Sequence, residues 1–366
     1  MIKKAGSIVG SLLLIGLTVA VAAWAFRTTS SERFTAAVVA ATPGIPTVHV
    51  QHPRGSATAF HAGVSVVVYG NDPYFQPKAQ VLLNRLADLG VNSVSLVIPV
   101  FQDGPTGSQV FADAKKTPSD VRISTFVNEA RRRGFTVMLR PLLDIGVPET
   151  PADWRGSIHP SDVTQWRQSY SALILDYARL AARDQVAIFD LGSELDSMEP
   201  NTAFWQHLIA SARAAYHGQI TYSSNWAKWY PAFGSSLDFI SIDAYFPLNR
   251  PATASAADLA DAWQQWINRM RAIARDFDKP LVLTELGATS LTASFQQPWV
   301  WDNGQPIDLT AQQRYYQAAC SSVVPRFAGV YWWMYSLDPP AKPVLDRSYT
   351  AAGKPAEADL KACFTR

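Results

Sequence analysis

The sequence predicts an α/β fold in which eight parallel strands close into a barrel, and three observations support this prediction. From His61 onward, short apolar runs alternate with amphipathic segments, which is the pattern of repeated strand–helix units. The apolar runs are nearly continuous, as expected for strands that are buried on both faces. The 366 residues, 48% of them hydrophobic, are sufficient for a (β/α)8 TIM barrel as a single domain.

Four strands and three helices make up the first half of the expected barrel. The first helix has Pro77 in its first turn, and the second begins after the capping residue Ser119 and ends at Gly134. The third helix carries apolar residues at helical spacing from Trp166 to Ala181. The expected strands of this half are 63–69, 93–99, 136–141 and 186–192.

The second half continues the same alternation. One helix has an apolar face from Trp205 to Tyr216, and a longer helix has apolar residues at helical spacing from Trp263 to Phe277. The expected strands of this half are 220–223, 239–244, 281–284 and 329–335. An open, doubly wound sheet is the alternative arrangement, but it usually has a glycine-rich turn after its first strand, and residues 69–72 do not form one.

The first 59 residues lie outside the barrel pattern. An uncharged run from Ile8 to Phe26 follows Lys3 and Lys4, and its length is near the roughly 20 residues needed to cross a bilayer as a helix. The preceding positive charges predict a cytoplasmic N-terminus. We therefore expect residues 1–27 to be a cleaved signal peptide or a signal-anchor helix, and the length of the run favours the anchor.

Either alternative predicts export to the periplasm or the extracellular space, with attachment to the membrane through residues 8–26 if that segment is not cleaved. Residues 28–59 are rich in Ala, Ser, Thr and Pro and are expected to be a linker, which leaves residues 60–366 as the folded domain. Cys320 and Cys363 lie on the last two expected helices, which are neighbours in a closed barrel. An oxidising compartment favours a disulfide between them, and two buried free thiols are the alternative.

Composition excludes some classes of function and permits another. The net charge of +2 argues against nucleic acid as a partner, and the densest basic cluster, Arg131 to Arg133, ends a helix and is expected to be exposed. The six histidines form no His-x-x-x-His pair, so we expect neither a metal nor another cofactor. Twelve tryptophans are compatible with carbohydrate binding, because aromatic rings stack on the apolar faces of sugars.

Two glutamates stand where expected strands end: Glu194 after the fourth strand and Glu285 after the seventh. Active sites of such barrels lie at the C-terminal ends of the strands, so both carboxyl groups are expected at one rim. Hydrolysis of a glycosidic bond uses a pair of facing carboxyl groups, one protonated and one ionised. Asp190 and Asp243 lie inside expected strands and are expected to support this pair.

Several motifs, in order along the chain, resemble glycoside hydrolase family 113, the β-1,4-mannanase family. They are residues 191–195 around Glu194, residues 205–226, residues 237–248, the strand 280–287 that contains Glu285, and the pair Pro298 and Trp299. The resemblance covers most of residues 60–335. Two positions depart from it: Ser193 stands where many members of the superfamily have asparagine, and Ala288 stands where an aromatic residue is expected.

The resemblance implies a retaining hydrolase of β-1,4-linked polysaccharide, with mannan or glucomannan as the expected substrate. Glu285 would be the nucleophile and Glu194 the general acid and base, with their carboxyl groups about 5 to 5.5 Å apart. We expect Tyr245 to hydrogen-bond Glu285, and Arg140 either to stabilise the charge of Glu285 or to form a structural ion pair. The candidate substrate-binding residues are Tyr69, Arg140, Asn225, Trp226, Tyr245, Trp299, Trp332 and Trp333.

Several alternatives stay open on the sequence alone. Trp332 and Trp333 are adjacent on one strand, so only one of them can face the interior of the barrel. The barrel could bind carbohydrate without cleaving it, because fold does not determine function. It could also cleave another β-glycan, such as a cellulose-like chain or an exopolysaccharide made by the same cell. The sequence does not distinguish endo from exo action.

Overall fold

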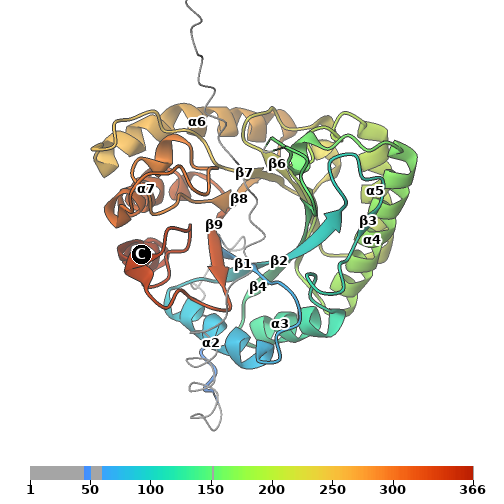
Figure 1. Cartoon of the computed structure of the whole chain (residues 1–366), viewed down its shortest axis with the longest axis horizontal. Coiled ribbons are helices and arrows are strands. Elements are labelled where there is room, and N and C mark those ends of the chain that lie inside the picture. Colours follow the sequence, from blue (N-terminus) through green and yellow to red (C-terminus); the bar gives the residue numbers. More distant parts are fainter. Residues whose placement is uncertain (1–44, 51–59, 151, 366) are drawn as a thin grey trace, which may run out of the picture.

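Eight parallel strands form a closed barrel in the computed structural model, which describes residues 45–50, 60–150 and 152–365 (Figure 1). These strands are β1 (His61–Val67), β2 (Ser93–Gln102), β4 (Thr136–Ile145), β5 (Ile188–Ser193), β6 (Gln219–Asn225), β7 (Ile240–Asp243), β8 (Leu281–Leu286) and β9 (Gly329–Ser336). They follow one another around the ring in the order β1-β9-β8-β7-β6-β5-β4-β2, and the pairing of β1 with β2 closes the ring. The predicted (β/α)8 TIM barrel is confirmed.

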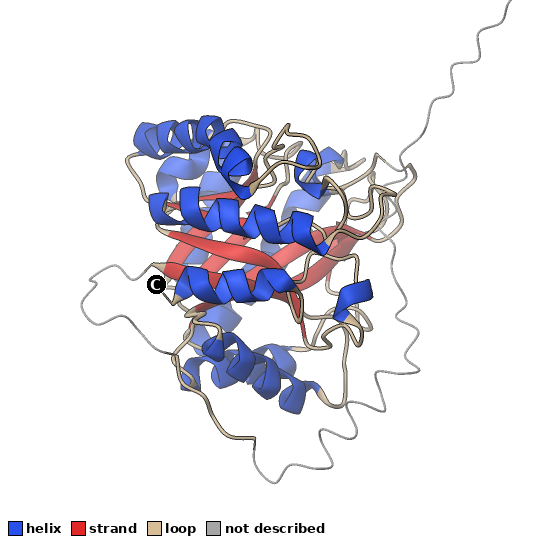
Figure 2. Cartoon of the chain, turned by 90° about the vertical axis from the view of Figure 1, so that its left-hand side faces the viewer, coloured by secondary structure: helices blue, strands red, loops and turns tan. Residues whose placement is uncertain are grey.

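An α-helix follows each barrel strand except β6, which is followed by the 3-10 helix Ala232–Ser236, and the helices cover the outside of the barrel, as the side view in Figure 2 shows. The α-helices are α2 (Phe75–Asp88), α3 (Asp120–Arg132), α4 (Val163–Arg183), α5 (Thr202–Ala215), α6 (Ala256–Phe277), α7 (Leu309–Ser322) and α8 (Pro355–Phe364). On α4, Trp166, Tyr170, Ile174 and Tyr177 recur at helical spacing and are all buried. A short strand, β3 (Val110–Phe111), pairs antiparallel with the end of β2.

β2 and β4 continue furthest beyond the residues predicted for them. β2 and β4 pair in parallel register as far as Gln102 and Ile145, although the sequence indicated ends at Pro99 and Pro141. A proline removes one donor from the ladder of hydrogen bonds, but the residues that follow it can still pair. The extension raises the wall of the barrel next to β5, the strand that leads to Glu194.

The interior of the barrel is layered, because alternate residues of each strand point inward. On β4, Met138 and Leu142 belong to two separate apolar clusters, and the buried Arg140 lies between them. The cluster near the strand starts contains Met138, Ile188, Phe239, Val282 and Tyr331. The cluster near the strand ends contains Val67, Val97, Leu142, Tyr245, Trp333 and Tyr349. A charged side chain at this depth requires partners of opposite charge at its own level.

Residues 45–50, which we name the strap, lie against α2 and the end of α3. The backbone amide of Val48 donates to Oδ1 of Asn84 at 3.1 Å. The amide of Val50 donates to the carbonyl oxygen of Arg133 at 2.8 Å. This part of the predicted linker is therefore hydrogen-bonded to the barrel domain.

Arg133 is 1% exposed, so the expectation that it lies on a solvated face is wrong. Its guanidinium donates to Oε2 of the buried Glu129 at 2.7 Å and to Oδ1 of Asn84 at 2.9 Å, which satisfies the charge. The predicted signal or anchor segment, residues 1–27, lies outside the described residues. Among the residues that the structure does describe, no helix is both long and apolar enough to cross a membrane.

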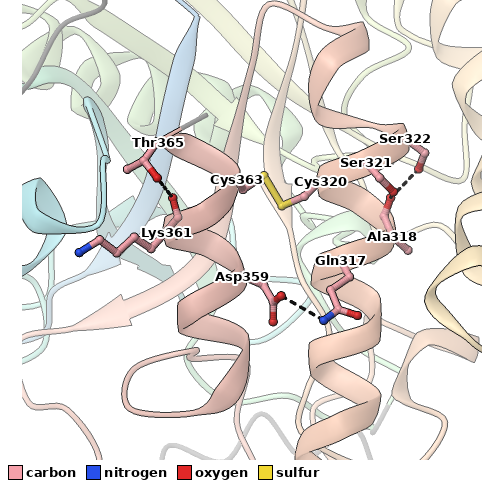
Figure 3. The surroundings of a disulfide bond; sticks show 9 residues. All are labelled: Gln317, Ala318, Cys320, Ser321, Ser322, Asp359, Lys361, Cys363 and Thr365. Carbon is pink, nitrogen blue, oxygen red and sulfur yellow. Dashed lines mark hydrogen bonds between the residues drawn. A yellow bond between two sulfur atoms is a disulfide. The ribbon is translucent and has the colours of Figure 1, made fainter.

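A disulfide joins Cys320 on α7 to Cys363 on α8, as Figure 3 shows. The two Cα atoms are 5.6 Å apart, and Gln317 of α7 donates a hydrogen bond to Asp359 of α8 at 3.0 Å beside the bridge. The disulfide predicted from the two cysteines is thus present. It fastens the last helix of the chain to its neighbour on the outside of the barrel.

Replacing both cysteines with serine should lower the free energy of unfolding by about 4 kcal/mol, because the bridge closes a loop with a sequence separation of 43 residues. Urea denaturation of the wild-type and double-serine proteins measures this difference. Reduction of the wild-type protein should reproduce the shift and have no effect on the double-serine variant. An unchanged denaturation midpoint in the variant would contradict a stabilising role for the bridge.

Candidate active site

Glu194 directly follows β5, and its backbone adopts the left-handed conformation with φ of 53°. A residue other than glycine rarely adopts this conformation, and it persists where surrounding contacts hold it. The amide of Glu194 donates to the carbonyl oxygen of Ser223, and the amide of Leu195 donates to the hydroxyl of Tyr222, each at 2.8 Å. These bonds to β6 fix the turn that carries the Glu194 side chain.

Glu285 lies near the end of β8, three strands around the ring from β5. Glu285 is 5% exposed and Glu194 is 7% exposed, so both carboxyl groups are largely shielded from water. They are close enough for the charge of Glu285 to raise the pKa of Glu194, although burial raises it more. The structure therefore brings the two predicted catalytic glutamates together at the C-terminal end of the barrel.

Arg140 on β4 is completely buried and connects the carboxylates of three other strands. Its Nη2 atom lies 2.7 Å from Oδ2 of Asp243 and 2.9 Å from Oε1 of Glu285. Its Nε atom lies 3.3 Å from Oδ2 of Asp190. Arg140 thus both contacts a catalytic candidate and forms structural ion pairs, and Asp190 and Asp243 support the site as predicted.

Glu285 has two donors that stabilise its ionised form. The hydroxyl of Tyr245 donates to Oε2 at 2.5 Å, as the sequence predicted, and Arg140 approaches Oε1. Burial and the charge of Asp243 raise the pKa of Glu285, whereas Arg140 and the Tyr245 hydroxyl lower it. Each glutamate has an arginine beside one of its oxygens, and the Tyr245 hydroxyl lowers the pKa of Glu285 further, so we assign Glu285 the lower pKa of the two.

Glu194 has a different pair of partners. Nδ2 of Asn225, at the end of β6, donates to Oε1 at 3.1 Å, and Nη1 of Arg155 donates to Oε2 at 3.0 Å. Burial raises the pKa of Glu194, the charge of Asp243 raises it further, and Arg155 lowers it. Arg155 is itself held by a bond from Nε to the carbonyl oxygen of Leu143 at 2.8 Å.

Ser193 is directed into the protein rather than towards the open end of the barrel. Its hydroxyl donates to Oδ2 of Asp243 at 2.7 Å and accepts from Nη2 of Arg140 at 2.6 Å. Ser193 is 1% exposed, and Thr284 donates to the other oxygen of Asp243 at 2.9 Å. Ser193, where the resemblance led us to expect asparagine, therefore supports the buried charges.

Most of the predicted aromatic residues lie near the two glutamates or at the rim. Trp333 belongs to the apolar cluster near the strand ends, together with Tyr245, whose hydroxyl contacts Glu285. Trp226 follows β6 and stacks on Trp299, with ring centroids 5.0 Å apart. Trp299 is 41% exposed; Tyr69, which is 59% exposed, interacts electrostatically with Asp144 and Arg155.

Trp332 does not belong to the site, and its prediction as a substrate-binding residue is wrong. Its ring is completely buried and stacks on Tyr316 of α7, with centroids 3.8 Å apart. The adjacent Trp333 faces the interior instead, in agreement with the expectation that only one of the two can do so. Trp332 packs in the layer between the strands and the helices.

Three residues near the site were missed by the sequence analysis. Arg155 comes from the connection between β4, the third predicted strand, and α4. Its position as a basic residue after that strand was the only sign in the sequence that it could reach the site. Tyr349 follows β9 and packs against Tyr245, with ring centroids 5.9 Å apart. Trp301 packs on Tyr349, and its position two residues after Trp299 was the only indication.

Burial and the charge of Asp243 raise the pKa of both carboxyl groups, and each has an arginine partner, but only Glu285 also accepts a hydrogen bond from a tyrosine hydroxyl. Two carboxyl groups in unequal environments can divide the roles of base or nucleophile and acid. Across the described residues, no group of three or more His, Cys, Asp or Glu side chains is arranged to hold a metal ion. The arrangement is suited to acid–base and nucleophilic chemistry by side chains.

A family model described as Glycoside Hydrolase Family 113 matches residues 67–354, which is more than half of the chain. Among solved structures, the GH113 β-mannanase from Alicyclobacillus acidocaldarius in complex with ManMIm is 26% identical in sequence. That comparison has a TM-score of 0.75 and covers 84% of this chain and 97% of the mannanase.

Two further structures are similar in fold. A GH113 β-1,4-mannanase is 24% identical, with a TM-score of 0.76, and the match covers 84% of this chain and 99% of that chain. The endo-β-1,4-mannanase from Thermotoga petrophila is 13% identical, with a TM-score of 0.53, and the match covers 83% of this chain and 76% of that chain. A comparison with curated proteins finds no match.

Proposed function

Since the chain belongs to glycoside hydrolase family 113 and is a glycoside hydrolase, we propose that it cleaves the β-1,4-linked backbone of mannan or glucomannan with retention of configuration. The similarity to a GH113 β-mannanase over nearly the whole of that enzyme supports the substrate class. The single observation that carries the mechanism is the unequal pair of buried glutamates at the strand ends.

In the first step, a carboxylate oxygen of Glu285 attacks the anomeric carbon, and the bond from that carbon to the glycosidic oxygen breaks. The carboxyl group of Glu194 gives its proton to the departing oxygen, so the leaving sugar is released as an alcohol. Arg140 and Tyr245 hold Glu285 in position for this attack. The product is a covalent glycosyl ester on Glu285.

In the second step, the Glu194 carboxylate takes a proton from water while the water oxygen attacks the anomeric carbon. The ester bond to Glu285 breaks, and the enzyme regains its starting protonation state. Asn225 and Arg155 hold the Glu194 carboxylate during this exchange of roles. Two inversions at one carbon give retention, and we expect the carboxyl separation of about 5 to 5.5 Å that such enzymes use.

Release of reducing ends from mannan, glucomannan, cellulose, xylan and chitin tests this proposal directly. The domain from residue 45 onward, which keeps the strap, is compared with its Glu285→Gln variant, which keeps the size of the side chain. Activity on mannan that is lost in the variant supports both the substrate and the nucleophile. Binding without cleavage would instead indicate a carbohydrate-binding barrel, and activity on another polymer would reassign the substrate.

The pH dependence of kcat/KM should be bell-shaped, with its alkaline limb displaced above the ordinary glutamate pKa of 4.5. Activity falls at high pH because Glu194 loses the proton that it donates, and burial and Asp243 raise that pKa. Activity falls at low pH because Glu285 becomes protonated. Asp243→Asn removes a nearby negative charge and should move the alkaline limb to lower pH; an unmoved limb would refute the role of Asp243.

We also propose that the domain works outside the cytoplasm. The disulfide between Cys320 and Cys363 supports this location, because such bonds persist in oxidising compartments. Immunoblotting of the washed membrane, periplasmic and secreted fractions tests the location and any membrane attachment. A shortened, fully soluble protein would exclude an uncleaved anchor, and a full-length protein in washed membranes would support one.

A further inference from the structure

Trp301 is a large apolar side chain that is held in place and yet is 49% exposed. It lies in the connection between β8 and α7, two residues after Trp299. One side of the ring packs against Tyr349 in a T-shaped arrangement, with centroids 4.8 Å apart and planes at 80°. An exposed indole of this kind offers a rigid apolar surface at a small cost in conformational entropy.

Two contacts on either side of Trp301 fix its position. The hydroxyl of Tyr349 donates to the carbonyl oxygen of Pro298 at 2.5 Å. Nη2 of Arg347 donates to Oδ1 of Asp302 at 2.6 Å. Both contacts join the connection after β8 to the segment after β9, so the two segments hold the indole between them.

Trp301 is linked to the nucleophile through a short series of packed rings. Tyr349 is 1% exposed and lies against Tyr245, with ring centroids 5.9 Å apart. Tyr245 in turn donates its hydroxyl hydrogen bond to Glu285. Burial raises the pKa of Tyr349, and the negative charges of Glu285 and Glu194 raise it further. The indole therefore borders the layer of side chains that surrounds the two glutamates.

The ring order of the strands gives the side of the site on which Trp301 lies. In the order of eight strands, β9 is diametrically opposite β5. Glu194 follows β5, whereas Tyr349, the support of Trp301, belongs to the segment after β9. In the proposed mechanism the leaving group departs towards Glu194, so the sugars that stay bound to the enzyme extend away from it.

We propose that Trp301 is the stacking platform of a subsite for a sugar unit on the non-reducing side of the bond that is cleaved. The ligand is a pyranose ring within a β-1,4-linked chain, which presents its apolar C–H face to the indole. The direction of the chain rests on the proposed function, whereas the binding role of the indole does not. Such a subsite selects substrates that extend at least one sugar beyond the reacting unit.

Binding of mannohexaose to the Glu285→Gln protein, measured by isothermal titration calorimetry, tests the platform. Adding Trp301→Ala should weaken binding about tenfold, in line with the loss of one aromatic stacking contact. Trp229→Ala is the matched control, because Trp229 is also 49% exposed but lies beneath the guanidinium of Arg269 on α6. The control should bind as its parent does.

Kinetics with substrates of different length test the position of the subsite. In the otherwise wild-type enzyme, Trp301→Ala should lower kcat/KM for mannohexaose about tenfold. Hydrolysis of an aryl β-mannoside with a single sugar should be unaffected, because that substrate does not reach the indole. A loss of equal size on both substrates would overturn the subsite and indicate a structural role for Trp301.

Failure of this inference is distinguishable from failure of the proposed function. A wild-type enzyme that cleaves mannan, with a Trp301→Ala variant that matches it on every substrate, overturns the inference alone. If the wild-type enzyme cleaves no mannan, binding of cellohexaose and xylohexaose to the Glu285→Gln protein decides the role of the indole. Equal binding with and without Trp301, or no binding of any of the three oligosaccharides, overturns it.

Discussion

Replacing Glu285 with alanine should abolish hydrolysis, with kcat lowered by roughly four orders of magnitude or more, and added azide should restore turnover of an activated aryl β-glycoside. The shorter side chain leaves space where the carboxylate attacked, so azide approaches the same face of the sugar. The expected product is an α-glycosyl azide. Its formation, followed by proton NMR of the anomeric hydrogen, identifies Glu285 as the nucleophile.

The corresponding Glu194→Ala variant gives the opposite stereochemistry. Glu285 still forms the covalent ester when the leaving group is activated, and azide then replaces water in the second step. The expected product is a β-glycosyl azide. A β product from the Glu285 variant, or an α product from the Glu194 variant, would mean that the two roles are assigned to the wrong residues.

Replacing Arg140 with glutamine should lower the free energy of unfolding by about 3–5 kcal/mol and remove most of the activity. The variant leaves Asp190, Asp243 and Glu285 buried near one another without their shared cation. Burial raises the pKa of Asp190 to about 6 even with Arg140 present, and loss of the cation raises it further. Groups whose folded pKa is raised stabilise the protein at low pH, so the variant should become less stable as the pH rises.

Denaturant titrations between pH 4 and pH 8 measure this effect, and a second variant checks its cause. Adding Asp243→Asn to Arg140→Gln removes one of the stranded charges and should restore part of the stability without restoring activity. The wild-type protein should show the weaker pH dependence. Equal stability of wild-type and Arg140→Gln proteins at neutral pH would refute the role assigned to the guanidinium.

The barrel and its two glutamates were predictable because both depend on local sequence. Periodicity within each segment identifies a strand or a helix, and the end of a strand places Glu194 and Glu285 at the rim. Tyr245 was predictable for the same reason, since it lies at the end of a strand next to that of Glu285. Each of these inferences uses only neighbours in sequence and the order of the strands.

Other features depend on the paths of connections, which local sequence does not define. Arg155 reaches Glu194 only through the course of the connection between β4 and α4, and Tyr349 returns to the site from beyond the last strand. Whether Trp332 or Trp333 faces inward also could not be derived. The pairings of β9 with both neighbours contain register shifts, and such irregularities break the simple alternation along a strand.

The position of the strap shows at which end of the barrel the chain enters the domain. It lies beside the last turn of α2 and the end of α3, where the chain turns back into the next strand, so it marks the end of the barrel opposite the glutamates. The residues that precede residue 45 therefore join the domain at the end of the barrel opposite the glutamates. Attachment at that end leaves the end with the glutamates unobstructed, so a long polymer can reach the site from the opposite side of the domain.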